Sequence, residues 1–493
     1  MATASAATRR RATTELGLLV IALLAMLVAA ALVELSQAPE IPEAVLTYGA
    51  AFLATAIVAH IGLRRLAPGA DPLLLPVAVL LTGLGLIMVR RIDFAGGEQA
   101  SFAANQVMWA AAAVLAFLLT LYFLRDHASL DGYRYLIGLG SLLLLLTPLL
   151  PGIGREVNGA RIWLSLGGLS FQPVEAAKLG FVIFFASYLS EKRDLLSVAT
   201  TRLGPLMLPP LRAFGPLLGI WVVGLAVLGL QRDLGPTLLL FGVFIVMLYI
   251  ATGRLAYPVI GLLLAGVGGF LAYRSFAHVQ DRVAIWLDVW SRYDSDGFQL
   301  AQSLFAIGTG GVTGVGLGQG QPDFVPFVRT DFIFSAFAEE TGLLGTTAIL
   351  LCFVVLIGRG FRIALQARDD LGALLAAGLT SILALQVFVI VGGVTRLIPL
   401  TGITLPFVSY GGSSLLANFV LVALLARISA PGRPRPRRSR SRAARAEASA
   451  GGADDASWDG GQRSGAATDA ASWGGEQRSG EGTDAAAPRA GEG

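Results

Sequence analysis

Charged residues are scarce in this chain. They make up 14% of its 493 residues, against about 25% in ordinary soluble domains. Hydrophobic residues reach 55%, and the mean hydropathy is +0.68. So little polar surface cannot cover the exterior of a water-soluble protein of this length, and the composition therefore excludes a set of soluble domains. We expect an integral membrane protein.

Cysteine and histidine are also nearly absent. The single cysteine, Cys352, lies in an apolar run, which excludes a disulfide framework and a cysteine zinc site. The three histidines, His60, His127 and His278, are too few and too scattered for a histidine metal cluster. We therefore predict no resident metal site.

What the sequence does contain is a series of apolar runs close to the 20 or so residues that a membrane-spanning helix needs. They predict an all-α polytopic integral membrane protein with about 12 transmembrane helices. The first run is longer than the roughly 7–15 apolar residues of a cleavable signal, so we interpret it as a retained anchor. The predicted spans are 16–34, 44–63, 73–89, 105–124, 133–150, 174–190, 213–230, 234–251, 255–273, 333–358, 371–394 and 408–427.

Basic residues in short loops indicate the orientation, because arginine and lysine collect on the cytoplasmic side. They precede the first span and recur in alternate loops, which places both termini in the cytoplasm; Arg90 and Arg91 are exceptions. The predicted parts of the chain are a cytoplasmic N-terminus at 1–15, an additional N-terminal helix pair at 16–72, a membrane core at 73–428 with a long extracytoplasmic loop at 274–332, and a disordered cytoplasmic tail at 429–493.

The tail differs in composition from the rest of the chain. Residues 433–445 hold seven arginines, which either attract anionic lipid head groups or only flank the last span. Beyond them, a fifteen-residue repeat occupies 456–470 and 471–485. Its Gly, Ala, Ser and acidic residues cannot bury a core, so we expect disorder and no catalysis there.

Three segments rich in Gly, Pro, Arg and aromatic residues face outward in this topology, at 151–173, 274–332 and 395–414. Irregular backbone at a membrane surface persists where it packs in protein or lines a wet cavity. The three segments therefore indicate one composite site at the outer leaflet. The glycines of 308–320 lack a Gly-Lys-Ser/Thr ending and a preceding strand, which argues against nucleotide binding and favours a tight turn.

Asp331 is the strongest catalytic candidate, since it directly precedes the apolar residues that open a span. Partial desolvation there would raise its pKa and make it a better base, although Arg329 would lower that pKa. The alternative is that Thr330 or Asp331 only caps the helix. Glu175 and Lys178, three residues apart, either form a structural ion pair or line a polar cavity. For Asp233 we favour a structural hairpin tip.

Five strings, in this order along 73–428, resemble the SEDS family, the FtsW/RodA polytopic proteins of bacterial envelope synthesis. They are NGARIWLSLGGLSFQPVEAAKL at 158–179, QRDLGPTLLL at 231–240, GFQLAQSLFAIGTGGVTGVGLGQG at 297–320, TDFIFSAFAEETG at 330–342 and PLTGITLPFVSYGGSS at 399–414. The chain departs from the family in its additional N-terminal helix pair, in QRDLGP where QPDLGT is common, and in QPVEAAK where QPSE-x-AK is common. The additional pair resembles actinobacterial RodA-type members.

The resemblance implies a peptidoglycan glycosyltransferase that polymerises lipid II at the outer face of the cytoplasmic membrane. It places the essential acid of the family on Asp331 and gives substrate-binding roles to the matched motif residues, which are Trp163, Glu175, Lys178, Ser409, Gly411 and Gly412. It also implies a class B penicillin-binding protein as partner, besides lipid II and membrane lipids, and no nucleic acid. Elongation is favoured over division.

The reaction expected from this resemblance is an inverting transfer. The C4 hydroxyl of an incoming lipid II attacks C1 at the reducing end of the strand, with Asp331 as base, and undecaprenyl pyrophosphate leaves. Four outward arginines could bind that pyrophosphate: Arg161, Arg282, Arg329 and Arg396. A divalent cation could assist, but no ligand cluster marks a site for one. The alternatives are a lipid II flippase and a non-catalytic scaffold for the transpeptidase.

Overall fold

The structure is a computed structural model in which residues 1–432 form one compact unit. The predicted disordered tail lies outside the described residues from 431 onward. The described residues are 2–37, 43–95, 102–157, 160–166, 169–197, 201–203, 206–208 and 215–430.

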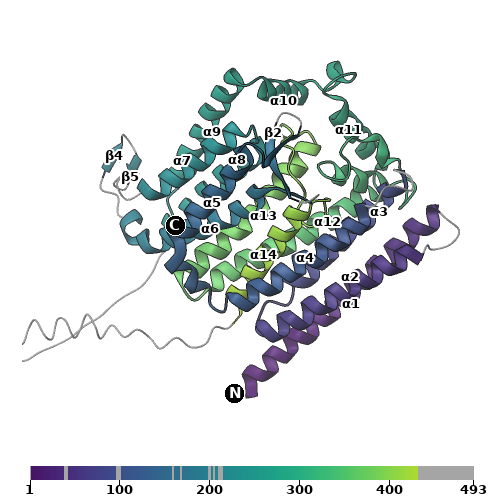
Figure 1. Ribbon diagram of the computed structural model, residues 1–493, viewed down its shortest axis with the longest axis horizontal. Helices are drawn as coiled ribbons and strands as arrows, with labels where there is room; N and C mark the ends of the chain where they lie inside the picture. Colours follow the sequence, from purple (N-terminus) through teal and green to yellow (C-terminus); the bar gives the residue numbers. More distant parts are fainter. Residues whose placement is uncertain are drawn as a thin grey trace, which may run out of the picture. The chain divides into compact units, whose positions relative to one another are not determined.

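Helices dominate the described residues (Figure 1). Eleven of those in the described ranges are long and apolar enough to cross a membrane. The predicted span 213–230 forms a shorter apolar helix of 16 residues. The prediction of a nearly all-helical multi-pass membrane protein is confirmed, whereas the count of twelve and the cytoplasmic position of both termini stay predictions, as do the boundaries of the predicted parts.

The helices are α1 (Ala2–Gln37), α2 (Glu43–Leu66), α3 (Leu74–Ala95), α4 (Phe102–Phe123), α5 (Arg134–Leu146), α6 (Pro173–Ser197), α7 (Gly215–Leu230), α8 (Leu234–Thr252), α9 (Ala256–Ser275), α10 (Ala277–Leu287), α11 (Phe298–Gly310), α12 (Ile333–Gln366), α13 (Asp370–Val394) and α14 (Gly412–Ser429), with short 3-10 turns η1 (His127–Tyr133), η2 (Thr147–Leu149), η4 (Trp290–Arg292) and η5 (Pro322–Phe324).

Five short strands interrupt the helices, which the sequence did not predict. Strands β1 (Gly154–Val157), β2 (Ala160–Leu166) and β3 (Leu169–Phe171) form a three-stranded antiparallel sheet. Strands β4 (Thr201–Leu203) and β5 (Leu206–Leu208) form a separate hairpin. The first sheet leads directly into α6 and so introduces the helix that carries Glu175 and Lys178.

The centre of the bundle is formed by α6, α13 and α14, which are the most deeply buried of the long helices. Figure 1 shows α1 and α2 as a purple hairpin at the edge of the bundle. In that hairpin α1 packs against α3, and α2 packs against α4. α3 runs the length of the bundle, with Asp71 before its first turn and Asp93 in its last. Asp93 pairs with Arg329, two residues before Asp331. We therefore call the two ends of the bundle the Asp71 end and the Asp331 end.

Helix α12 is broken at Gly342, whose backbone is non-helical with φ 64° and ψ −164°. The glycine-rich segment after α11 fills the break: the N–H of Leu343 donates to Gly311, and the N–H of Val315 donates to Glu339. A Cβ at Gly342 would lie 2.3 Å from the nitrogen of Gly314, so only glycine fits this close approach. The predicted tight turn in 308–320 therefore completes the hydrogen bonds of a broken helix.

Candidate active site

Asp331 lies on a tight turn directly before α12. The N–H groups of Thr330 and Asp331 both donate to the carbonyl of Phe327, whose φ of 55° is rare for a bulky residue. Ser409, from the segment between α13 and α14, donates its hydroxyl to the carbonyl of Thr330 at 2.6 Å. Strained backbone held by neighbouring hydrogen bonds is typical of functional sites.

The capping alternative for this turn is wrong. α12 begins at Ile333, and its N-cap is Phe332, with no side-chain capping hydrogen bond. Thr330 and Asp331 precede this N-cap by two residues and one residue, and neither side chain caps the free N–H groups of the first helical turn. The carboxylate of Asp331 therefore has no structural task at the helix end.

Arg282 of α10 meets Asp331 beside Gly402. Nη1 of Arg282 donates to the carbonyl of Leu400 at 2.6 Å, which directs the guanidinium along the α13–α14 segment. Gly402 has a φ of 74°, and a Cβ added there would lie 3.6 Å from both Arg282 Nη2 and Asp331 Oδ2. The guanidinium and the carboxylate thus converge over the bare backbone of this glycine.

A second carboxylate, Asp233, enters the site from the junction of α7 and α8. It occupies the N-cap position of α8 but makes no capping hydrogen bond, and it is 8% exposed. The preceding Arg232 has a φ of 58°. Oδ2 of Asp233 has no hydrogen-bond partner in the part of the chain that the structure describes. Asp233 does lie at a hairpin tip, as predicted, but that tip faces Arg282 and Asp331.

Burial raises the pKa of both aspartates. The pKa of Asp331 is raised to about 6, against a hydrogen bond with Thr330 and the positive charge of Arg282. The pKa of Asp233 is raised to about 7, against the charge of Arg282 and with the support of Glu175 and Asp331. A carboxylate with a pKa near 6 is ionised at neutral pH and is a stronger base than an exposed one, which suits a general base.

Glu175 and Lys178 form the predicted pair in the first turns of α6, next to the two aspartates. Lys178 Nζ donates to Glu175 Oε2 at 2.7 Å and to Gln386 Oε1 at 2.9 Å. Gln386 in turn donates Nε2 to the carbonyl of Thr404 at 2.9 Å. Both charged residues are buried and line a small internal cavity. The pair is therefore held by α13 and by the same segment that holds Asp331.

The structure separates the four predicted phosphate-binding arginines. Only Arg282 faces Asp331. Arg329 points away: its Nε lies 3.6 Å from Asp93 Oδ1, and its guanidinium stacks 4.4 Å from the Phe102 ring centroid. The expectation that Arg329 lowers the pKa of Asp331 is wrong, because the cation near Asp331 is Arg282.

Arg396 supports Arg282 from a distance. Its Nε donates to the carbonyl of Trp286 at 2.7 Å and its Nη2 to that of Leu287 at 2.6 Å. Trp286 returns a hydrogen bond from Nε1 to the carbonyl of Arg396 at 3.1 Å. Arg396 thus fastens the last turn of α10, the helix that carries Arg282, to the α13–α14 segment.

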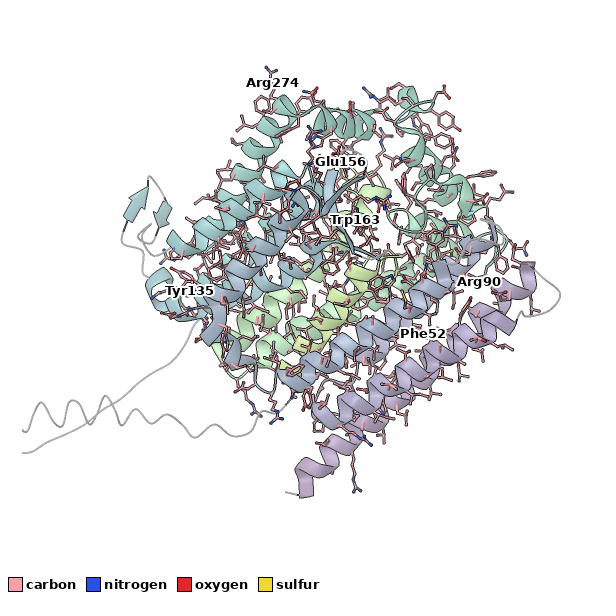
Figure 2. All side chains as sticks on the ribbon, in the orientation of Figure 1. Phe52, Arg90, Tyr135, Glu156, Trp163 and Arg274 are labelled. Atoms are coloured by element: carbon pink, nitrogen blue, oxygen red, sulfur yellow. The ribbon has the colours of Figure 1, made fainter. Side chains whose placement is uncertain are left out.

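Arg161 and Trp163 lie on β2 of the small sheet. Figure 2 labels Trp163 and, on the adjacent strand β1, Glu156. Arg161 is exposed, and its Nε lies 3.0 Å from Glu156 Oε2. The structure does not bring Arg161 into the group around Asp331. Trp163 is half-buried and pairs with Arg155 across the sheet.

Ser409, Gly411 and Gly412 shape the backbone around the site. Ser409 is 4% exposed and, besides its bond to the Asp331 turn, accepts the N–H of Leu405 at 2.9 Å. Gly411 is the N-cap of α14. A Cβ at Gly412 would lie 2.1 Å from the Trp109 ring, so α14 begins in close contact with α4. The substrate-binding roles predicted for these residues stay predictions.

Two residues of the site were missed or undervalued from the sequence. Gln386 gave no signal, since it is one polar residue in a long apolar run. Asp233 gave a signal in the family-like string QRDLGP, where an acid opens an apolar helix. No group of three or more His, Cys, Asp or Glu side chains that could hold a metal ion occurs among the described residues.

Comparison with known proteins identifies the family. The model of the FtsW/RodA/SpoVE family, described as a cell cycle protein, matches residues 71–433. The chain is 49% identical over 427 residues to the peptidoglycan glycosyltransferase RodA of Mycobacterium tuberculosis, covering 86% of this chain and 91% of that one. It is 38% identical to the stage V sporulation protein E of Bacillus subtilis, covering 73% and 96% of the two chains.

Solved structures agree with the sequence relatives. A chain from a study of polymerisation and crosslinking by a peptidoglycan synthase complex aligns with a TM-score of 0.60 at 28% identity, covering 73% of this chain and 97% of that one. The rod shape determining protein RodA of Thermus thermophilus aligns with a TM-score of 0.53 at 26% identity, covering 74% and 98%. Fold, motifs and relatives converge, and the chain belongs to the FtsW/RodA/SpoVE family.

Proposed function

We propose that this protein is a peptidoglycan glycosyltransferase that polymerises lipid II into glycan strands and that its site faces the extracytoplasmic side. The observation that carries the proposal is the meeting of half-buried Asp331 with Arg282 over Gly402, where desolvation raises the pKa of Asp331 to about 6. The names of its relatives support the same activity.

In the proposed reaction, Asp331 accepts the proton of the C4 hydroxyl of the incoming lipid II. The hydroxyl oxygen bonds to C1 at the reducing end of the growing strand, with inversion at that carbon. The bond from C1 to the pyrophosphate oxygen breaks, and its electron pair leaves with undecaprenyl pyrophosphate. Arg282 stabilises the negative charge that develops on this leaving group. Asp331 and Arg282 suffice for the proposed step. Assays with a chelator and with added magnesium test whether a divalent cation assists.

The arrangement predicts a specific pH dependence. A general base works only when it is deprotonated, so polymerisation should fall about tenfold per pH unit below the pKa of Asp331 near 6. Above that pKa, Asp331 is fully deprotonated and the polymerisation rate should no longer rise with pH on account of Asp331. The measurement is the initial rate of strand formation between pH 5 and 8.

Polymerisation of purified lipid II by the detergent-solubilised protein tests the assignment. Replacing Asp331 by Asn should lower the rate about 10²–10⁴-fold, the usual contribution of a general base. Asp323→Asn is the matched control, since Asp323 is an exposed aspartate in the same loop, and it should retain the rate. Equal strand formation by wild type and Asp331→Asn would refute the catalytic role. Transport of lipid II across vesicles without any strands would identify a flippase instead.

We also propose that the chain works with a class B penicillin-binding protein, the partner expected from the family resemblance. The structural likeness to a chain of a peptidoglycan synthase complex supports this. A purified transpeptidase of this class should raise the polymerisation rate of the wild type and leave Asp331→Asn inactive. Polymerisation that is indifferent to the partner would leave the enzyme assignment standing and reject the partnership.

A further inference from the structure

A large apolar cavity lies between the N-terminal hairpin and the bundle. α1 packs against α3 and α2 against α4, whereas α1 and α2 make few contacts with each other. The cavity that α1, α2 and α3 enclose has a volume of about 600 Å³. This volume is within the ~300–1,000 Å³ usual for ligand sites. Figure 2 labels Phe52 and Arg90 where the hairpin faces α3, and both residues line this cavity.

The cavity is elongated along the helices. Its lining follows α1 from Val20 to Glu34, which corresponds to about 20 Å of helix rise. That length exceeds half of the roughly 30 Å hydrocarbon core of a bilayer. Apart from one end, the lining consists of Leu, Val, Ala, Phe, Met and other apolar side chains. An apolar space of this shape repels water, and an empty one would forfeit dispersion contacts along its walls. An alkyl chain suits it.

One end of the cavity is polar and carries both signs of charge. Glu34 is 1% exposed, and its Oε1 accepts a hydrogen bond from Arg90 Nε at 3.0 Å. Its other oxygen, Oε2, is buried and has no hydrogen-bond partner in the residues the structure describes. Glu34 lies three residues before the end of α1, which places it at the level of lipid head groups.

We propose that this cavity binds a phospholipid with a primary ammonium head group, of the phosphatidylethanolamine class. One acyl chain fills the space between α1, α2 and α3. The phosphate lies beside Arg90, and the ammonium donates to the free oxygen of Glu34. A choline head group has no N–H to donate, and the glycerol head group of phosphatidylglycerol offers the carboxylate only neutral hydroxyl donors, which bind it more weakly than an ammonium. The zwitterionic pair Glu34–Arg90 thus matches a zwitterionic lipid.

The bound lipid borders the support of the active site. Ala103 lines the cavity and donates its N–H to Asp93 at 2.8 Å, and Asp93 in turn pairs with Arg329 of the Asp331 turn. The bound lipid therefore fills the space between the hairpin and α3 and stabilises their packing. This binding site is independent of the proposed glycosyltransferase activity, since its occupancy is measured without substrate.

Native mass spectrometry of the full chain tests the site. Protein in detergent micelles is titrated with phosphatidylethanolamine, phosphatidylcholine or phosphatidylglycerol of identical acyl chains. We expect one tightly retained phosphatidylethanolamine, favoured about tenfold over phosphatidylcholine, as one charge-assisted hydrogen bond predicts. Glu34→Gln should abolish this preference. Glu191→Gln, which removes an exposed carboxylate paired with Arg134, should not.

A second variant tests the chain-binding part without touching the charged pair. Ala31→Phe places a ring in the cavity and should abolish retention of every lipid, whereas Ala25→Phe, at an exposed position of the same helix outside the lining, should retain it. Retention that does not depend on the head group would overturn the proposal. So would a preference for phosphatidylglycerol, or unchanged binding by Ala31→Phe.

Discussion

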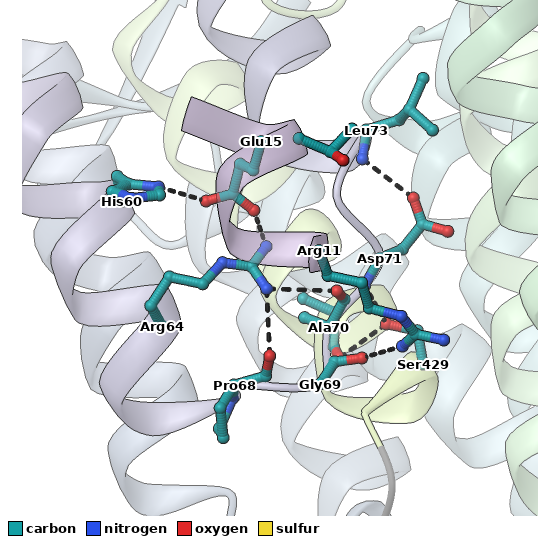
Figure 3. Close-up of polar contacts among 12 residues, drawn as sticks. Arg11, Glu15, His60, Arg64, Pro68, Gly69, Ala70, Asp71, Leu73 and Ser429 are labelled. Atoms are coloured by element: carbon teal, nitrogen blue, oxygen red, sulfur yellow. Dashed lines mark hydrogen bonds and ion pairs between the residues drawn. The ribbon is translucent and has the colours of Figure 1, made fainter. Parts of the chain in front are cut away.

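The Asp71 end of the bundle and the group around Asp331 use the same charged residue types in different ways. At the Asp71 end the carboxylates are paired: Glu15 contacts His60 and Arg64, and Asp71 accepts the N–H of Leu73 (Figure 3). Asp71 also pairs with Arg359. Pairs such as Arg329 with Asp93 and Arg90 with Glu34 also occur at the Asp331 end. Beside them, among the described residues, Arg282 is shared between the two aspartates Asp233 and Asp331. Paired charges fasten helices to one another, whereas incompletely paired ones retain capacity for a substrate.

After replacement of Asp331 itself, removing the shared cation should have the largest effect on the polymerisation rate. Arg282→Gln takes away the positive charge beside the leaving group and leaves Asp233 and Asp331 without a counterion. We expect polymerisation to fall about 10²–10³-fold, as after loss of a single transition-state donor. Arg274→Gln, an exposed arginine at the end of α9 (Figure 2), serves as the control and should keep the rate. If both variants keep the rate, the Asp331 end does not depend on its cation.

Loosening the support of Arg282 should lower the polymerisation rate by a smaller factor. Arg396→Ala removes the hydrogen bonds to Trp286 and Leu287 and frees the end of α10, so Arg282 is held less firmly. We expect about a tenfold loss of rate from this change of positioning. Leu397→Ala, at the exposed neighbouring position, is the control. Because Arg396 does not face Asp331, the pH profile should be unchanged, and an altered profile would contradict a positioning role.

Replacing the second aspartate should shift the pH profile. Asp233→Asn removes a negative charge near Asp331 and leaves Arg282 to interact with Asp331 alone. Both changes favour the ionised form of Asp331, so its pKa should fall below the value of about 6 by up to roughly one unit. The acid limb of the rate profile should move to lower pH accordingly. Disappearance of the acid limb would show that Asp233 is itself the group that titrates, and a limb that stays in place would contradict the coupling of the two aspartates.

The Asp71 end should show the reverse pattern, with an effect on stability and almost none on catalysis. Asp71→Asn breaks the ion pair with Arg359, and we expect a loss of about 2 kcal/mol in the free energy of unfolding. Thermal unfolding in detergent measures this change. The polymerisation rate per folded molecule should stay at the wild-type value, and a selective loss of rate would remove the contrast between the two ends.

The spans were predictable because a membrane helix is defined by a local property, a long apolar run. The position of Asp331 at the start of a span was predictable for the same reason. Which arginine meets Asp331 was not. Arg329 is two residues away in sequence but turns toward Asp93, while Arg282 arrives from a different helix and is directed by the carbonyl of Leu400. Such pairings depend on tertiary packing, which the order of residues along a loop does not reveal.

The small sheet and Gln386 were missed for related reasons. β1 and β3 have only four and three residues, too few for a clear alternation of apolar and polar residues. Gln386 is a lone polar residue on a buried helix, and its importance appears only when Lys178 and Thr404 are seen on either side of it. The candidate site was therefore found from the sequence as a list of ionisable residues, and the structure selected among them.

The break in α12 has a consequence for the order of assembly. The carbonyl and N–H groups that complete the helix around Gly342 belong to residues 311–316, and these leave the ribosome before Gly342 does. The first half of α12 can therefore dock onto a partner that is already made, without waiting for later helices. Asp331 lies two residues before that half-helix, whereas Ser409, which clamps its turn, lies in the later segment between α13 and α14. Maturation of the catalytic end thus depends on completion of the C-terminal helices.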